Sequence, residues 1–259
     1  MRPNFETVTP AKAKIYLQNM AKNRPVSKSK LKRYISDIEE GRWNEWCGSI
    51  EFRKADGKTM NGQHRLLAII ATGKSMNLLL VHGVPDDAFA TMDTGKRRNG
   101  SDTLSVSGYK NTNLTAAAIA MVERYRTGKM EHVITFTNQE ILDLAKKYND
   151  IAPSVTYAAS HKVRWLRASV VAAFHYLFSK RDPDAADAFF NKLISGQGLS
   201  NGDPAYILRE RLIENMTAPI RLTEPAVRAL LIKAWNAHYQ GRRLRTLSQK
   251  RTDAFPEIV

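Results

Sequence analysis

The stretch Asp56-Gly57-Lys58-Thr59-Met60-Asn61-Gly62-Gln63-His64-Arg65-Leu66-Leu67-Ala68 decides how the first part of this chain folds. Asp56-Gly57 is typical of a hairpin turn, and residues 58–60 are expected to return beside a short strand that contains Ile50 and Phe52. An apolar helix is expected directly afterwards, from His64 to Thr72. The stretch therefore predicts a strand, a turn, a second strand and a helix in immediate succession.

The junction between Asn61-Gly62 and this helix has the properties of an anion-binding site. A glycine permits a tight turn, the first N–H groups of a helix point outward, and the helix dipole favours negative charge there. Arg65 can contact phosphate oxygens through two N–H groups at once. The alternative is that Arg65 forms an ion pair with a nearby aspartate, and the residues alone leave both interpretations open.

Outward from this stretch, local patterns divide the chain near residue 110. Before it, helices are expected at about 10–20, 27–41, 64–72 and 86–92, and strands at about 50–52, 58–60 and 77–82. After it, helices are expected at about 112–127, 137–149, 164–180, 183–195, 203–216 and 223–240. We therefore predict an α+β protein, mostly α, with a first domain of residues 1–110 and an all-α domain of residues 111–259. Seven aromatic residues are assigned to the core of the helical domain: Trp165, Phe174, Tyr176, Phe178, Phe189, Phe190 and Trp235.

Charge is the unusual feature of the composition. The 259 residues include 40 Lys and Arg against 25 Asp and Glu, a net charge of +15 at pH 7. Basic residues gather in residues 7–36 and 225–252, which contain no acid, and in residues 96–98. Such a surface attracts polyanions such as nucleic acid, although both windows could also be solvated helix faces. The candidate DNA-binding residues are Lys28, Lys30, Lys32, Arg33, Arg98, Arg242, Arg243 and Arg245.

Several protein classes are excluded by what the sequence lacks. A single cysteine, Cys47, excludes an internal disulfide framework and a cysteine-based zinc site, and the six histidines show no metal-binding spacing. Neither Gly-Lys-Thr/Ser sequence is a phosphate loop, because Phe52 and Ala68 replace the required glycine. No apolar stretch is long enough to cross a bilayer, and the N-terminus is too polar for a signal peptide. We therefore expect a cytoplasmic protein without a metal site or membrane contact.

The order helix, strand, Asp-Gly turn, strand, Gly-x-x-Arg-x-x-Ala, helix and strand resembles the ParB/sulfiredoxin superfamily, specifically its phage and bacterial ParB-like nuclease branch. The resemblance covers about residues 25–100. Gly62-Gln63-His64-Arg65 stands where ParB has Gly-Glu-Arg-Arg and sulfiredoxin has Gly-Cys-His-Arg, a motif that binds nucleotide phosphates in both. Residues 93–98 and 232–237 are also similar to phage members of the branch. The resemblance implies a small mixed sheet with helices, and a DNA-associated protein in the bacterial cytoplasm or nucleoid.

The resemblance and the residue chemistry together define a candidate site. His64 is a candidate general acid or base, Arg65 is expected to stabilise charge, and Asp56 is a candidate catalytic carboxylate. The implied cofactor is a nucleoside triphosphate with Mg²⁺. A basic loop at residues 94–98 either completes this site or is an exposed connection between domains. The expected phosphate-binding residues are Asn61, Gly62, Gln63, Arg65, Thr94, Lys96 and Arg97.

Two departures from the superfamily limit what the resemblance implies. Gln63 replaces the catalytic cysteine of sulfiredoxin, which excludes its reductase chemistry, and His64 replaces the first arginine of the ParB motif. Two functions stay open. The chain is either a ParB-like enzyme that cleaves DNA or hydrolyses a nucleotide, or a non-catalytic DNA-binding or regulatory protein with the same fold. The lack of a compact carboxylate cluster favours the second. DNA is the expected partner in both, and self-association stays open.

Overall fold

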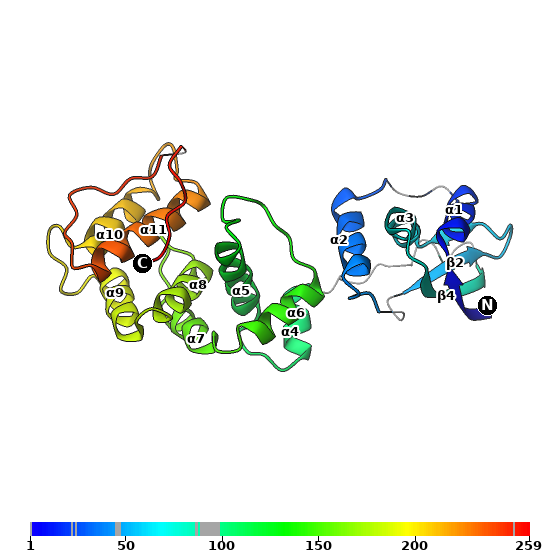
Figure 1. Ribbon diagram of the computed structural model, residues 1–259, viewed down its shortest axis with the longest axis horizontal. Helices are drawn as coiled ribbons and strands as arrows, with labels where there is room; N and C mark the ends of the chain where they lie inside the picture. Colours follow the sequence, from blue (N-terminus) through cyan, green and yellow to red (C-terminus); the bar gives the residue numbers. More distant parts are fainter. Residues whose placement is uncertain are drawn as a thin grey trace. The chain divides into compact units, whose positions relative to one another are not determined.

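In the computed structural model the chain forms two compact units, Met1–Arg97 and Arg98–Val259. Its helices and strands make an α+β protein in which helix predominates, which confirms the predicted fold class (Figure 1). Residues 98–110, which the sequence assigned to the first domain, belong to the second unit, because helix α4 (Gly100–Val106) packs against helices of that unit. The structure describes residues 2–21, 23, 25–44, 48–85, 88, 99–250 and 252–259.

The first unit is built on a four-stranded mixed sheet of order β1-β4-β2-β3. The central pair, β2 and β4, is parallel, and both outer strands are antiparallel to their neighbours. Strands β2 to β4 lie where the sequence predicted them, but β1 was missed because it is an edge strand whose side chains are mostly exposed. The strands are β1 (Arg2–Val8), β2 (Ser49–Arg53), β3 (Thr59–Asn61) and β4 (Met76–Val84).

Three helices accompany this sheet: α1 (Pro10–Gln18), α2 (Lys28–Glu39) and α3 (Gln63–Thr72). Helix α3 packs against both α1 and α2, and it lies between them in Figure 1. Its Leu66 and Ile69 are buried in one core with residues of β2 and β4. This packing brings α2 alongside α3, so both helices contribute residues to the site described below. The helix predicted at 86–92 lies largely outside the described residues.

Among its described residues, the second unit contains helices joined by loops and no strand. The sequence missed α4, a single short segment of seven residues, and α7, which carries few large apolar residues. The remaining helices are α5 (Thr112–Arg126), α6 (Asn138–Lys147), α7 (Ala152–Ser160), α8 (Ala168–Ser179), α9 (Pro183–Ser195), α10 (Pro204–Glu214) and α11 (Glu224–Tyr239).

Helix α8 is the centre of the second unit. Its residues 170–178 are all buried, as expected of a helix that is apolar on every side and surrounded by neighbours. It packs against α5, α7 and α9, and Phe178 stacks on Trp235 with ring centroids 4.3 Å apart. Six of the seven predicted core aromatics are buried, whereas Trp165 is only partly buried at the edge of this core.

The last residues of the chain are fixed to this unit partly by the side-chain amide of Asn236. Asn236 on α11 donates to the carbonyl of Glu257 over 2.7 Å, and its Oδ1 accepts the N–H of Val259 at 3.2 Å. Ile258 between them is buried, and its N–H donates to the Tyr125 hydroxyl at 2.7 Å. Residues 232–237, singled out in the sequence, therefore help to anchor the C-terminal segment.

Candidate functional site

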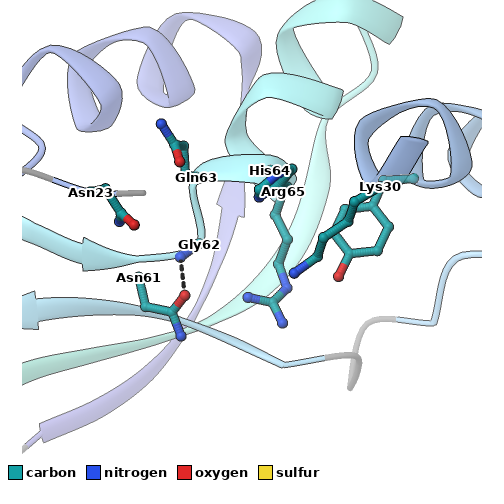
Figure 2. A pocket seen from close by; sticks show the side chains of 8 residues that line it. Asn23, Lys30, Asn61, Gly62, Gln63, His64 and Arg65 are labelled. Atoms are coloured by element: carbon teal, nitrogen blue, oxygen red, sulfur yellow. Dashed lines mark hydrogen bonds between the residues drawn. The ribbon is translucent and has the colours of Figure 1, made fainter. Parts of the chain in front are cut away.

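A pocket lies where β3 runs into α3, at the motif that the sequence singled out (Figure 2). The residues of this motif were predicted to form a binding site, and they line the pocket. Asn23 and Tyr34 were not predicted as lining residues, and Lys30 was predicted as a DNA-binding residue instead. The pocket is lined by Asn23, Lys30, Tyr34, Asn61, Gly62, Gln63, His64 and Arg65.

Gly62 makes the turn from strand to helix. Its φ of 103° lies in the left-handed region, and a Cβ at this position would come within 2.2 Å of the Ile50 side chain. The Gly62 N–H donates to Oδ1 of Asn61 at 2.8 Å, the contact drawn in Figure 2. Gly62 offers no side chain to cap α3, and the first turn of this helix holds no acid. The helix N-terminus therefore faces the pocket with its positive dipole end uncompensated by a capping side chain.

Arg65 is the third residue of α3, in its first turn, and lines the pocket with its guanidinium beside β2. Its Nη1 donates to the carbonyl of Ser49 over 2.9 Å. The group passes so close to Gly48 that a Cβ there would lie 2.1 Å from Nη2. The charge is thus held at the pocket by the backbone of residues 48–49, at a fixed place where it can attract an anion.

His64 has a structural contact that the sequence did not reveal. The side chain is 6 % exposed, and its Nε2 accepts the N–H of Ser27 at 2.9 Å. Ser27 is the N-cap of α2, so this bond ties the start of α2 to the start of α3. A ring nitrogen that accepts a backbone N–H is already engaged, which favours a positioning task for His64 over proton transfer.

Lys30 and Tyr34 reach the pocket from α2. The Lys30 ammonium lies 5.5 Å from the centre of the Tyr34 ring. Asn23 is held in place because its amide donates to the carbonyl of Met60 over 3.0 Å. The described residues lining the pocket thus include two cations, Lys30 and Arg65, and no carboxylate.

Gln63 carries an orphaned polar atom at the first position of α3. Its Oε1 is buried without a hydrogen-bond partner among the described residues. A buried amide oxygen without a donor costs free energy, so the site is incomplete in this one respect. A ligand hydroxyl or amine in the pocket would satisfy it.

The structure places Asp56, which the sequence predicted as a catalytic carboxylate, away from the pocket. Asp56 lies in the turn of the β2–β3 hairpin, at the opposite end of β3 from Asn61. Its carboxylate accepts from Arg53 and from the Lys58 N–H, and these contacts, the Arg53 bond above all, lower the pKa of Asp56. Asp56 therefore stabilises the turn, and it does not line the pocket.

Other predicted residues fall outside the pocket or outside the described chain. Thr94, Lys96, Arg97 and Arg98 lie outside the described residues, as does Cys47. Across the described residues, no group of His, Cys, Asp and Glu side chains is arranged to hold a metal ion.

The remaining DNA-binding candidates lie on separate units. Lys28 and Lys32 are exposed on α2, and the Nε of Arg33 on the same helix donates to the carbonyl of Ser29 at 3.4 Å. Arg242, Arg243 and Arg245 are exposed beyond the end of α11 in the second unit.

Arg243 is committed to a structural contact in that unit. Its guanidinium donates to the carbonyl of Asn201, and its Nε would lie 3.0 Å from a Cβ placed on Gly202. It fixes the 200–202 loop, which makes it a weaker DNA-binding candidate than its two neighbours.

A Ser–His–Asp chain in the second unit was also missed by the sequence. Ser154 Oγ lies 3.0 Å from His175 Nδ1, and His175 Nε2 lies 2.8 Å from Asp187 Oδ1. The residue types are those of a hydrolase triad, but the ring nitrogens are exchanged, because in a triad Nε2 faces the serine and Nδ1 faces the carboxylate. Moreover, Ser154 is only 4 % exposed and His175 is stacked on Tyr157, so the hydroxyl is enclosed in the core. We interpret the chain as hydrogen bonding that satisfies polar groups between α7, α8 and α9.

Comparison of the chain with protein-family models, with curated proteins and with solved structures found no match. Among the described residues, no helix combines the length and apolar character needed to cross a membrane.

Proposed function

We propose that the first unit binds a phosphate group, of a nucleotide or of DNA, at the pocket formed by Gly62 to Arg65. The observation that carries the proposal is the left-handed Gly62, which turns β3 directly into a helix without a side-chain cap. Helix N-termini of this kind attract anions through both their N–H groups and their dipole. Lys30 and Arg65 add two positive charges to the same lining, in which the described residues include no carboxylate.

DNA is the proposed partner. The net charge of +15 favours association with a polyanion, and Lys28 and Lys32 are exposed on the helix that brings Lys30 to the pocket. The resemblance to ParB-like phage proteins agrees with this chemistry and would imply a protein of the bacterial cytoplasm or nucleoid.

Binding without turnover is the form of this function that the geometry favours. Nε2 of His64 accepts the Ser27 N–H, and Asp56 is bonded to Arg53 and Lys58 away from the pocket. A reaction on a phosphate would therefore need an acid, a base or metal ligands from other parts of the chain. We accordingly propose a non-catalytic DNA-binding or regulatory protein, with nuclease or nucleotide hydrolase activity as the rival.

The test is calorimetric titration of the full chain with ATP, CTP and GTP, each with and without Mg²⁺. Lys30→Gln and Arg65→Gln should each weaken nucleotide binding about tenfold, because each removes one charge-assisted contact to phosphate. Lys14→Gln is the matched control, since Lys14 is exposed on α1 and does not line the pocket. Equal affinity in all three variants would refute the pocket as the binding site.

A second experiment separates binding from chemistry. The affinity for a DNA duplex, measured by fluorescence anisotropy, should fall steeply between about 50 and 200 mM salt because counterions are released. Plasmid DNA incubated with the protein, Mg²⁺ and nucleotide should stay intact. Cleavage that Arg65→Gln abolishes would establish the enzymatic rival instead.

A further inference from the structure

The helical unit contains a second cationic pocket, formed where α8 and α11 begin. The cavity measures about 330 Å³. We call it the arginine pocket, and its lining includes Arg164, Trp165, Arg167, Val170, Arg221 and Glu224. None of these residues was predicted as a functional residue from the sequence.

Positive charge exceeds negative charge at this pocket. Three of its lining residues are arginines, and Glu224 is the one acid among them. That carboxylate is already shared, since Oε1 lies 3.1 Å from Nη1 of Arg167 and Oε2 lies 3.0 Å from Nη2 of Arg228. Arg164 and Arg221 are exposed beside it and add two further charges.

Arg228, which is paired with Glu224, is a buried cation next to this excess of positive charge, and burying it costs free energy. It is 8 % exposed, and its Nε is buried without a hydrogen-bond partner among the described residues. Burial lowers the pKa of Arg228, and the nearby charges of Arg124 and Arg167 lower it further, while Glu224 opposes them. A buried guanidinium beside two like charges and one shared carboxylate is stabilised by any additional anion.

We propose that the arginine pocket binds a nucleotide phosphate, from a free nucleotide or from the phosphorylated end of a DNA strand. The guanidiniums of Arg164 and Arg221 would hold the phosphate in the forked geometry that arginine offers. The start of α8 adds its dipole, because its N-cap residue Arg167 makes no side-chain cap.

The size and apolar part of the lining select a nucleotide over inorganic phosphate. A cavity of about 330 Å³ is in the range of small-molecule sites, and a phosphate ion alone would leave most of it unfilled. Trp165, which is only partly buried, offers apolar surface for a sugar or base. Arg209 lies 5.3 Å from the Trp165 ring centre and fixes the indole from one side. This proposal does not depend on the pocket at Gly62.

The test uses the full chain and three probes: dAMP, a 5′-phosphorylated trinucleotide and inorganic phosphate. The double variant Arg164→Gln/Arg221→Gln should raise the Kd for the bound nucleotide about a hundredfold, because two charge-assisted contacts are lost. Both side chains are exposed, but the double variant also removes the bond from Nη2 of Arg221 to the carbonyl of Met216 at 3.1 Å, so thermal unfolding is used to verify that folding is preserved. The control Lys129→Gln/Arg211→Gln removes the same charge from exposed residues elsewhere in the unit and should change the Kd less than about twofold.

A variant that should increase nucleotide affinity strengthens the test. Glu224→Gln removes the carboxylate that competes with the phosphate, so nucleotide affinity should rise rather than fall. The titrations are made in the Arg65→Gln background, in which binding at the first pocket is weakened, so that the measured Kd reports on the arginine pocket.

The probes also separate the sources of the phosphate. Tighter binding of dAMP identifies a free nucleotide, and tighter binding of the trinucleotide identifies a DNA end. Equal Kd values for the double variant and its control, or binding of inorganic phosphate alone, would overturn the proposal.

Discussion

The two cationic pockets of this protein are built in opposite ways. The pocket at Gly62 depends on the backbone: a left-handed glycine and an uncapped helix place the dipole and N–H groups of α3, and Lys30 and Arg65 supplement them. The arginine pocket depends on side chains that come from the segment before α8 and from α11 and the residues before it. A single backbone substitution should therefore destroy the first pocket, whereas the second should weaken in steps as charges are removed.

Gly62→Val should have the largest effect on stability and on phosphate binding among the substitutions that test this comparison. Valine is strained in the left-handed region, and its Cβ would meet the Ile50 side chain at 2.2 Å. Together these should destabilise the first unit by roughly 4 kcal/mol and abolish its phosphate binding. Chemical denaturation followed by hydrogen exchange should show the loss in residues 2–85, while exchange protection in the helical unit is retained.

Gly57→Val is the matched control for this substitution. Gly57 is also left-handed, at φ 68°, but nothing lies within 4 Å of a Cβ there. It should cost about 1–2 kcal/mol from backbone strain alone and leave phosphate binding intact. If both variants lost binding equally, loss of stability rather than the geometry of Gly62 would account for the result.

The same contrast explains how much the sequence could predict. The strand, turn and helix around Gly62 are contiguous, so turn chemistry and apolar periodicity were sufficient to find the element order and the motif. Edge strand β1 lacked a periodic signal because its side chains are mostly exposed. Short α4 and the apolar-poor α7 were missed for a related reason, since little in their own sequence distinguishes them from loops.

Contacts between distant segments were beyond local patterns. The bond from Ser27 to His64 joins residues 37 positions apart, and the ion pair between Arg167 and Glu224 at the arginine pocket joins residues further apart still. Isolated arginines in a basic chain carry no signal of convergence, so the arginine pocket could not be predicted. Asp56 shows the opposite case. It is close to the motif in sequence, but it lies at the other end of β3 from the pocket.

His64→Ala should have the second-largest effect. It leaves the Ser27 N–H without its acceptor and removes a buried ring, so the first unit should lose about 2 kcal/mol of unfolding free energy. Phosphate binding should weaken because α2 and its Lys30 are no longer fixed beside α3. His64→Gln, whose amide oxygen can accept from Ser27, should recover part of both losses. Full loss of stability without any loss of binding would show that this bond does not shape the pocket.

A fall in pH should weaken the unit that carries the arginine pocket. Burial lowers the pKa of His175 from 6.5, against an opposing contribution from Asp187, and burial also lowers the pKa of His238. The folded chain therefore binds a proton at either ring less readily than the unfolded chain does, so the stability linked to these two groups is complete above pH 6.5. It is lost as the pH falls below 6.5, because the unfolded chain binds the protons first.

The measurement is the unfolding free energy of the helical unit at pH 8, 7, 6 and 5. His175→Gln should flatten its decline between pH 7 and 5, since one of the two titrating groups is gone. A decline that is unchanged in this variant would assign the pH dependence to other groups.

Asp56→Asn should have the smallest effect on stability and on nucleotide binding. It tests whether the hairpin turn contributes to either pocket. The carboxylate is exposed in the hairpin turn, and its partners Arg53 and Lys58 do not line either pocket. Exposed ion pairs contribute little to stability, so the thermal midpoint should stay close to that of the wild type. Nucleotide affinity at both pockets should be unchanged as well, and a titration of Asp56→Asn with ATP and dAMP measures this. A loss of binding at the first pocket would restore Asp56 to the site and show that the hairpin turn contributes to it, making that pocket less purely a product of the Gly62 backbone.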